Sequence, residues 1–188
     1  METLTKISVE AYLENEAKAA FKSQYVEGEV VAMAGAGIPH KRIVANLIAE
    51  LVFCLKNKNC QVFPSDLLLE IAECDRYTYP DIVVVRGKVE TDSQKRGGLD
   101  VLLNPSIVIE VLSDTTEKDD RGDKFECYKT LPSLKTYVLV SSKKVLVEIF
   151  ERTPENNWLI IAEKDISKTI QMGDCEVLLE EIYDKVIF

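Results

Sequence analysis

The chain has 188 residues, of which 46% are hydrophobic and 29% are charged. These values are close to the averages of globular domains, so we expect one domain over residues 1–188 and exclude a disordered chain or a fibrous repeat. The 23 basic and 32 acidic residues give a formal net charge of −9, which disfavours a nonspecific coat on nucleic acid. Any contact with DNA must therefore be local or assisted by a metal ion.

The sequence also predicts the cellular location of the protein. No apolar run reaches the ~20 residues that span a bilayer, and the N-terminus lacks the basic and apolar regions of a signal peptide. We therefore expect a cytoplasmic protein without membrane contact. The 5 cysteines show neither zinc-site nor redox-pair spacing, so they are predicted to be reduced, mostly buried thiols. The single histidine, His40, excludes most hydrolase chemistries that are built on several histidines.

The N-terminal part of the chain predicts two helices around a hairpin. Residues 8–20 have apolar side chains at helical spacing, with Ser8 as the N-cap. Two β-prone runs over 24–33 are broken at Gly28, which suits a tight hairpin. Over 39–57, apolar residues recur at intervals of three and four, and the initial proline suits a first helical turn, so we expect a second helix there.

The middle of the chain predicts the centre of a sheet. Short strands are expected over 60–63 and 67–71. Two near-continuous apolar runs, Tyr79–Val85 and Ser106–Leu112, are typical of strands that are covered on both faces. The polar stretch Arg86–Asn104 between these runs is predicted to be a surface loop.

The C-terminal part predicts a helix followed by strands. Thr116 and Asp119 match a loose capping box, which opens a helix that ends before Pro132. The remaining expected elements are strands over 136–140 and 145–151, at least one further strand in the remainder that includes residues 158–161, and a short helix near 178–183.

Two of the buried strands each carry one carboxylate. Glu110 lies in the middle of the run IVIEVL, and Asp81 opens the neighbouring run directly after Pro80. A lone ionised carboxylate inside a sheet costs several kcal/mol unless a cation or hydrogen-bond donors compensate it. Lys124 lies on the helix that follows Glu110, and this helix can return over the same sheet. We therefore predict that two carboxylates and an amine converge.

Carboxylate oxygens suit hard cations, and Mg²⁺, or Mn²⁺ in its place, takes one or two carboxylates while it keeps waters that a phosphate can replace. Such an ion would orient and acidify a water and stabilise charge on the scissile phosphate, with Lys124 as the positively charged partner. The predicted reaction is hydrolysis of DNA phosphodiesters, with Asp81 and Glu110 as metal ligands. Gly35-Ala36-Gly37 lacks the lysine of a P-loop, so no nucleotide cofactor is expected.

Three segments of the chain resemble a known family. They are YPDIVVV at Tyr79–Val85, NPSIVIEVLS at Asn104–Ser113, and DRGDKF at Asp120–Phe125, which Tyr128 follows. They resemble the Uma family of restriction endonuclease-like bacterial proteins, in the PD-(D/E)XK nuclease superfamily. The resemblance extends over nearly all of the chain and implies an α/β (α+β) restriction endonuclease-like fold. In this fold a central mixed sheet is flanked by helices, with an additional N-terminal hairpin and C-terminal strands.

The resemblance carries the metal roles to Asp81 and Glu110, but the chain departs from the family pattern at two positions. Leu112 stands two residues after Glu110, where the superfamily has a lysine, so the basic role falls to Lys124. Relatives commonly have a glutamate at the position of Gln24, and a glutamine can hold a water but cannot act as a base.

Simpler interpretations stay open at each position. Glu110 and Lys124 can form a buried ion pair without metal, and Asp81 can only organise a turn. The accessory candidates are His40, as a phosphate contact near a helix N-terminus, and Glu29, beside the hairpin glycine; their alternatives are a helix-border residue and an exposed turn residue. A catalytically inactive binding or regulatory module is therefore the alternative function, and a homodimer through an exposed strand edge is a third interpretation.

Overall fold

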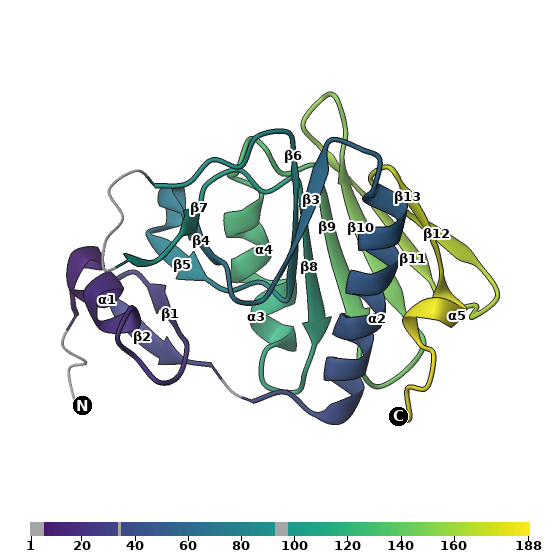
Figure 1. The fold of residues 1–188 in the computed structure, drawn as a ribbon, viewed down its shortest axis with the longest axis horizontal. Coiled ribbons are helices and arrows are strands. Elements are labelled where there is room, and N and C mark those ends of the chain that lie inside the picture. The colour runs from purple at the N-terminus through teal and green to yellow at the C-terminus, as the bar shows by residue number, and fades with distance from the viewer. Residues whose placement is uncertain (1–5, 34, 93–97) are drawn as a thin grey trace.

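The computed structural model describes residues 6–33, 35–92 and 98–188, which form a large mixed sheet, a smaller sheet beside it and helices that cover their faces (Figure 1). The helices are α1 (Val9–Glu16), α2 (Ile38–Leu55), α3 (Glu117–Arg121), α4 (Asp123–Tyr128) and α5 (Leu179–Ile182), with a 3-10 turn η1 (Ala72–Cys74). The strands are β1 (Ser23–Val26), β2 (Glu29–Ala32), β3 (Cys60–Pro64), β4 (Leu68–Ile71), β5 (Arg76–Thr78), β6 (Ile82–Arg86), β7 (Val101–Leu102), β8 (Ile107–Leu112), β9 (Thr136–Ser141), β10 (Val147–Arg152), β11 (Trp158–Glu163), β12 (Thr169–Met172) and β13 (Cys175–Leu178).

The large sheet has the strand order β11-β10-β9-β8-β6-β3. Strands β8 and β9 are parallel, whereas the other neighbours in this sheet pair antiparallel. The smaller sheet has the order β2-β1-β5-β4-β7, and β12 pairs with β13 in a hairpin. This mixed α+β architecture, with an N-terminal hairpin and C-terminal strands, confirms the fold class predicted from the sequence.

The central strands β6 and β8 are buried on both faces, as their apolar sequences predicted. Ile82 and Val84 pack in one core with the apolar side of α2, and Val83 and Val85 pack in a second core with α4. Figure 1 shows α2 on one side of β8 and α3 and α4 on the other. Because alternate residues of a strand face opposite sides, Glu110 of β8 lies on the side of α4.

Most predicted elements lie where the sequence placed them. Ser8 caps α1 and accepts a hydrogen bond from the Ala11 backbone N–H at 3.3 Å, although α1 ends at Glu16. The predicted hairpin consists of β1 and β2, and Gly28 adopts a φ of 94° in its turn, a conformation that glycine takes without steric cost. The apolar run that begins at Pro39 forms α2.

Three expectations were wrong in part. The stretch Arg86–Asn104, of which residues 93–97 lie outside the described ranges, is not only a loop, because Val101–Leu102 form β7 parallel to β4. The helix predicted from Thr116 is interrupted at Gly122, and the Thr116 hydroxyl bonds to the Ser113 hydroxyl instead of capping the helix. The short strand β5 was not expected, and β12 and β13 were not given positions within the C-terminal remainder, since three or four residues carry little periodicity.

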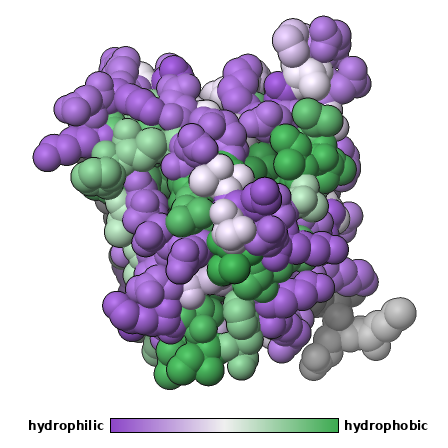
Figure 2. Space-filling model, turned by 90° about the vertical axis from the view of Figure 1, so that its right-hand side faces the viewer, coloured by the Kyte–Doolittle hydropathy of each residue, from purple (hydrophilic) through white to green (hydrophobic). Residues whose placement is uncertain are grey.

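Part of the apolar surface lies on a strand edge. Figure 2 shows hydrophobic patches set among hydrophilic side chains on the right-hand side of the molecule. Strand β11 is an edge of the large sheet, and three consecutive residues of it, Leu159, Ile160 and Ile161, are exposed. An open apolar edge can pair with another chain, so the homodimer stays a prediction that this edge suits. In the described ranges, no helix has the length and apolar character needed to cross a membrane.

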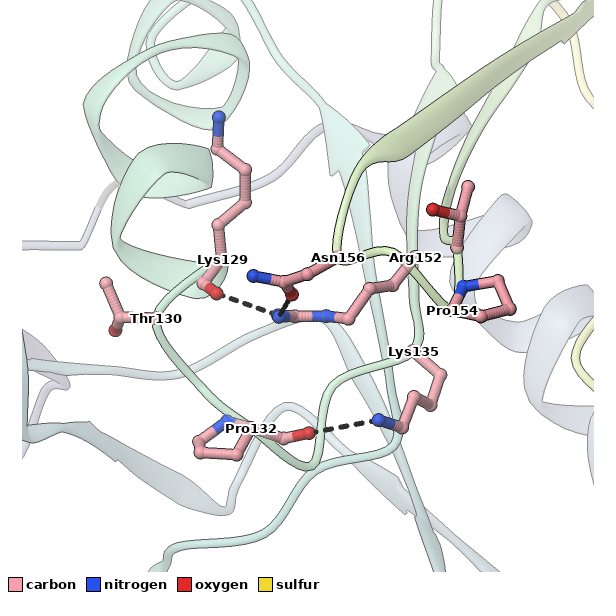
Figure 3. A pocket seen from close by; sticks show the side chains of 8 residues that line it. Lys129, Thr130, Pro132, Lys135, Arg152, Pro154 and Asn156 are labelled. Carbon is pink, nitrogen blue, oxygen red and sulfur yellow. Dashed lines mark hydrogen bonds between the residues drawn. The ribbon is translucent and has the colours of Figure 1, made fainter.

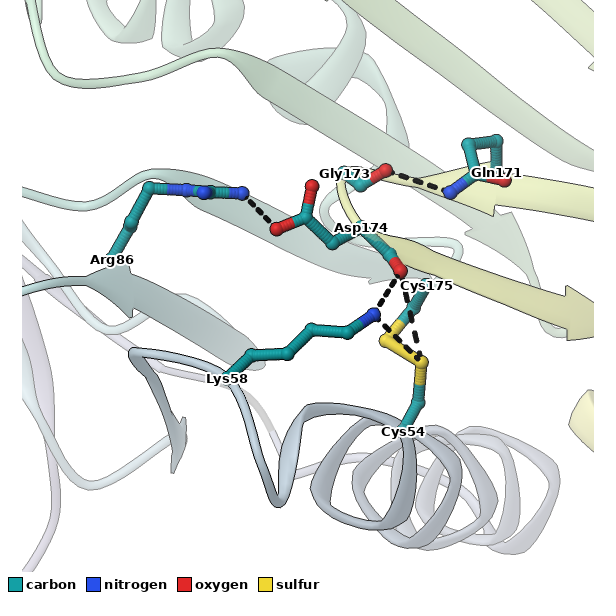
Figure 4. Close-up of a disulfide and its surroundings, with 7 residues drawn as sticks. All are labelled: Cys54, Lys58, Arg86, Gln171, Gly173, Asp174 and Cys175. Carbon is teal, nitrogen blue, oxygen red and sulfur yellow. Dashed lines mark hydrogen bonds and ion pairs between the residues drawn. A yellow bond between two sulfur atoms is a disulfide. The ribbon is translucent and has the colours of Figure 1, made fainter.

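Two disulfides show that the prediction of reduced cysteines was wrong. Cys54 on α2 is bonded to Cys175 on β13 (Figure 4), and Cys74 of η1 is bonded to Cys127 on α4. Cys60 is free. The bonded partners are 121 and 53 residues apart in the sequence, so they meet only when the tertiary structure forms and short-range spacing cannot identify them.

The bond between Cys74 and Cys127 is expected to stabilise the fold, because it joins the smaller sheet to the helix that packs on the large one. Replacing both cysteines by serine should lower the free energy of unfolding by about 2–4 kcal/mol, as urea unfolding under non-reducing conditions would measure. The matched control is Cys60→Ser, which removes a free thiol and should change this free energy by less than about 1 kcal/mol. Equal urea midpoints for the double variant and the wild type would contradict the expectation.

Candidate active site

The register of β6 and β8 brings two predicted residues together. Ile82 pairs with Ile109 in this antiparallel ladder, so Asp81, just before β6, lies beside Glu110. The Asp81 backbone N–H donates to Glu110 Oε2 at 3.3 Å, and the Val111 backbone N–H donates to Asp81 Oδ2 at 2.8 Å. Each carboxylate therefore accepts a backbone hydrogen bond from the segment that carries the other, and this holds both at one place on the sheet.

Helix α4 adds the amine to this pair. Lys124 Nζ lies 2.8 Å from Glu110 Oε1 and 2.8 Å from Asp120 Oδ1. The Tyr128 hydroxyl, one turn further along α4, donates to Glu110 Oε1 at 2.8 Å. The structure thus brings Asp81, Glu110 and Lys124 together on three different elements.

Asp120 is a member of this cluster that sequence reasoning missed. Glu110, Asp120 and Lys124 are 4%, 2% and 4% exposed, so all three are buried. Asp120 lies four residues before Lys124, a spacing that puts both side chains on one helical face and could have identified it. A run of charged residues is otherwise typical of a solvated surface. With Asp81, the cluster holds three carboxylates and only one ammonium group.

The burial of the cluster shifts the pKa values of its members. Burial raises the pKa of Glu110 to about 7, although the nearby Lys124 ammonium acts in the opposite direction. Burial alone would lower the pKa of Lys124, but the charges of Glu110 and Asp120 outweigh it and raise this pKa above its ordinary value. Lys124 therefore keeps its proton and remains the cation of the cluster.

His40 lies at the rim of the cluster. It is in the first turn of α2, and its Nε2 is 3.0 Å from Asp81 Oδ2. Burial acts to lower the pKa of His40, but the hydrogen bond and the charge of Asp81 raise it overall. Its other ring nitrogen, Nδ1, is buried and has no hydrogen-bond partner in the described part of the chain. His40 and the Val111 backbone N–H thus contact the same oxygen of Asp81.

The two other accessory candidates are placed differently. Gln24 lines the cavity of the carboxylates, and its side-chain oxygen accepts hydrogen bonds from Thr78 and Arg76. Glu29 is exposed on β2 and lines a neighbouring cavity of about 410 Å³, so the structure does not bring it to Asp81 and Glu110.

Access to the cluster comes from the side of Asp81. A cavity of about 70 Å³ lies directly over Asp81, Glu110 and Lys124. A second cavity, of about 550 Å³, shares Asp81 and His40 with the first and is also lined by Lys22 and Lys41. The carboxylates therefore adjoin an open space with basic groups on its wall, which suits a phosphate-containing ligand.

The carboxylate oxygens of the cluster are ligands of the kind that bind a hard divalent cation. No group of three or more His, Cys, Asp or Glu side chains within the described ranges is arranged to hold a metal ion. Mg²⁺, however, is usually held by one or two carboxylates and completes its shell with water. Asp81 and Glu110 supply two carboxylates at the edge of a cavity, and one ammonium leaves the three acidic groups with a formal excess of negative charge. These residues fit such an ion.

A larger cavity elsewhere lacks this chemistry. It has a volume of about 700 Å³, lies near the beginning of β9 and the end of β10, and is lined by Lys129, Lys135 and Arg152 but by no carboxylate (Figure 3). The Arg152 guanidinium donates to the backbone carbonyls of Lys129 and Leu131, at 2.7 and 3.0 Å, just after α4. Arg152 thus satisfies carbonyls at the end of a helix, and the acidic cavity is the candidate active site.

Comparisons with known proteins bear on this site. A family model named Uma2, described as "Putative restriction endonuclease", matches residues 9–173. Two uncharacterized proteins of Synechocystis sp., sll1609 and slr1290, are 34% and 35% identical over 158 residues, which is 83% of this chain and 87% and 80% of theirs. A crystal structure of "a putative nuclease belonging to DUF820" from Anabaena variabilis has a TM-score of 0.71 at 15% identity and covers 93% of this chain and 98% of that one. The last similarity concerns the fold alone.

Proposed function

This chain belongs to the Uma2 family, as the sequence resemblance predicted, and on that premise we propose that it is a metal-dependent endonuclease that hydrolyses DNA phosphodiesters. Its fold is that of the structure described as a putative nuclease. The observation that supports the proposal most strongly is the buried cluster in which Glu110 and Asp120 share the single ammonium group of Lys124, beside Asp81, which contacts His40. A divalent cation would balance this charge.

Asp81 and Glu110 are the residues that would hold Mg²⁺ or Mn²⁺. When bound, the ion would supply an acidified water and positive charge beside the scissile phosphate. Lys124 and Tyr128 both donate to Glu110 and keep its carboxylate in one orientation. His40 and the backbone of Val111 do the same for Asp81. The protein's own contribution is thus a pair of preorganised anionic ligands in a largely buried place.

The DNA backbone would approach from the cavity of about 550 Å³ that adjoins Asp81. Lys41 and His40 line this cavity and can neutralise phosphate charge near the site, whereas Lys22, which also lines it, already pairs with Asp66. Such local basic groups are needed because the whole chain has a net charge of −9. They also favour nucleic acid over an uncharged substrate.

The catalytically inactive module remains the alternative function, and the charge of the cluster argues against it. A structural ion pair needs one carboxylate for one amine, and Glu110 with Lys124 would meet that need alone. Asp120 adds a second buried carboxylate beside the same ammonium, which makes a metal-free cluster less stable, and Asp81 has the ring of His40 as its partner.

Metal binding and cleavage can be tested with Asp81→Asn, which keeps the shape of the side chain but removes its charge. Calorimetry should show that the wild type binds Mn²⁺ and that binding is at least about tenfold weaker in the variant. Plasmid nicking with Mg²⁺ or Mn²⁺ should be lost in the same variant. Asp184→Asn, which changes an exposed aspartate, is the matched control and should behave as the wild type. A wild type that takes up no metal and cuts no plasmid would establish the inactive module instead.

A further inference from the structure

The amide of Gln24 is held in one orientation. Its Oε1 accepts a hydrogen bond from Thr78 Oγ1 at 2.9 Å and from Arg76 Nη2 at 3.3 Å. A guanidinium has only donors, so the atom that faces Arg76 must be the amide oxygen and not the amide nitrogen. The hydrogen bonds of the described residues leave the Nε2 group of Gln24 without an acceptor. Its two N–H donors are therefore available to a ligand.

The group that imposes this orientation is itself fixed. Arg76 is only 3% exposed, lies on β5 and forms an ion pair with Asp119 of α3. Strand β5 pairs with β1, with Arg76 opposite Val26, so the backbones that carry Gln24 and Arg76 belong to one ladder. The amide of Gln24 cannot exchange its two ends without placing N–H donors against the guanidinium. The orientation is thus set by buried partners and not by solvent.

The position of the Gln24 amide suits its free N–H donors to hydrogen bonding with a ligand. Gln24 lines the small cavity together with Asp81, Glu110 and Lys124. It also lines a cavity of about 410 Å³ whose wall carries Glu29, Asp119 and Asp123, so a phosphate would reach Gln24 through the small cavity, which shares Asp81 and His40 with the cavity of about 550 Å³. On a wall that is otherwise rich in carboxylate oxygens, an N–H group attracts an anionic oxygen of a ligand and does not attract a metal ion.

We propose that Gln24 is a substrate-binding residue that donates a hydrogen bond to a non-bridging oxygen of the DNA phosphate in the active site. This inference rests on the proposed nuclease function and deepens it. It assigns Gln24 a role on the phosphate rather than on the metal. A glutamate at this place would offer an acceptor with a negative charge instead of a donor. It would therefore favour binding of the metal ion and repel the phosphate.

Two variants separate the lost donor from an added charge. Gln24→Met has a similar length, carries no charge and has no donor, whereas Gln24→Glu keeps an oxygen for Arg76 and Thr78 but adds a charge. Binding of a short DNA duplex, measured by fluorescence anisotropy in Ca²⁺, should be about tenfold weaker in both variants. Calorimetry without DNA should show unchanged Mn²⁺ affinity for Gln24→Met and higher affinity for Gln24→Glu. A purely structural defect would weaken both ligands.

The control is Gln61→Glu, which makes the same change of net charge at an exposed position on β3 and should alter DNA binding by less than about twofold. If Gln24→Met binds the duplex as tightly as the wild type, the inference is wrong even when Gln24→Glu binds more weakly. If Gln24→Met unfolds, the comparison of Gln24→Glu with Gln61→Glu decides. The inference is overturned if Gln24→Glu binds DNA as tightly as Gln61→Glu does. It is supported if Gln24→Glu binds DNA tenfold more weakly and Mn²⁺ more tightly. A wild type that binds neither Mn²⁺ nor DNA would instead refute the nuclease function.

Discussion

Replacing Glu110 by glutamine is expected to lower metal-dependent DNA nicking by about 10³-fold or more. The substitution removes one of the two carboxylates that would hold the ion, and groups that stabilise charge directly at a reacting centre usually have effects of this size. Nicking of supercoiled plasmid in Mg²⁺, followed with time and enzyme concentration, measures the loss. Addition of a chelator to the wild type should reduce nicking to the same residual level.

The fold of this variant is expected to remain intact. Glutamine has the shape of glutamate, and its amide oxygen can still accept hydrogen bonds from Lys124 and Tyr128 at the place of Glu110 Oε1, so the one hydrogen bond lost is the long one from the Asp81 N–H to Oε2. The change in unfolding free energy should stay within about 2 kcal/mol. Glu148→Gln is the matched control, since Glu148 forms an ion pair with Arg121 outside the acidic cavity. Nicking that survives in Glu110→Gln but requires Mg²⁺ would place the metal elsewhere.

Replacing Lys124 by methionine is expected to destabilise the protein by about 3–5 kcal/mol, because it leaves Glu110 and Asp120 buried without their cation. For a chain of this length the melting temperature should fall by roughly 10 °C. Differential scanning calorimetry in a chelator measures the effect without interference from bound metal. Lys129→Met is the control: its ion pair with Glu126 is on the surface, so the change should be below about 1 kcal/mol.

A double-mutant cycle shows whether the effect comes from the ion pair. In Glu110→Gln combined with Lys124→Met, both partners at 2.8 Å are neutral, so the loss of stability should be smaller than the sum of the single losses by about 1–3 kcal/mol. Additive losses would mean that Lys124 stabilises the fold through its aliphatic chain and not through its charge.

Regular patterns explain why much of the fold and part of the candidate site could be predicted. The run around Glu110 is long and apolar, so alternate counting identified a buried strand and the face on which its carboxylate lies. Asp81 follows from the same logic, because two such runs in one sheet pair when they are neighbours. Lys124 could be placed because a helix after a central strand returns over that sheet. Each of these steps depends on local periodicity.

The features that escaped prediction depend on contacts between distant segments. Arg76 looks like an ordinary surface residue, and only the ladder of β1 with β5 shows that it is buried against Gln24. Asp120 lies in a charged run that is typical of a solvated surface, whereas the structure buries it. Strand β7 has two residues and pairs with β4, far earlier in the chain. Arg76 and β7 leave no periodic signal, and Asp120 leaves only its spacing of four residues from Lys124.

The Cys54–Cys175 bond has a consequence for the integrity of the molecule. It encloses most of the chain, since its partners are 121 residues apart. A protease that cuts once anywhere inside this covalent ring leaves both fragments tethered, so the nicked molecule migrates as a single species until a thiol reductant is added. Proteolytic cleavage in an exposed loop of the ring would therefore break the backbone without releasing either fragment of the protein.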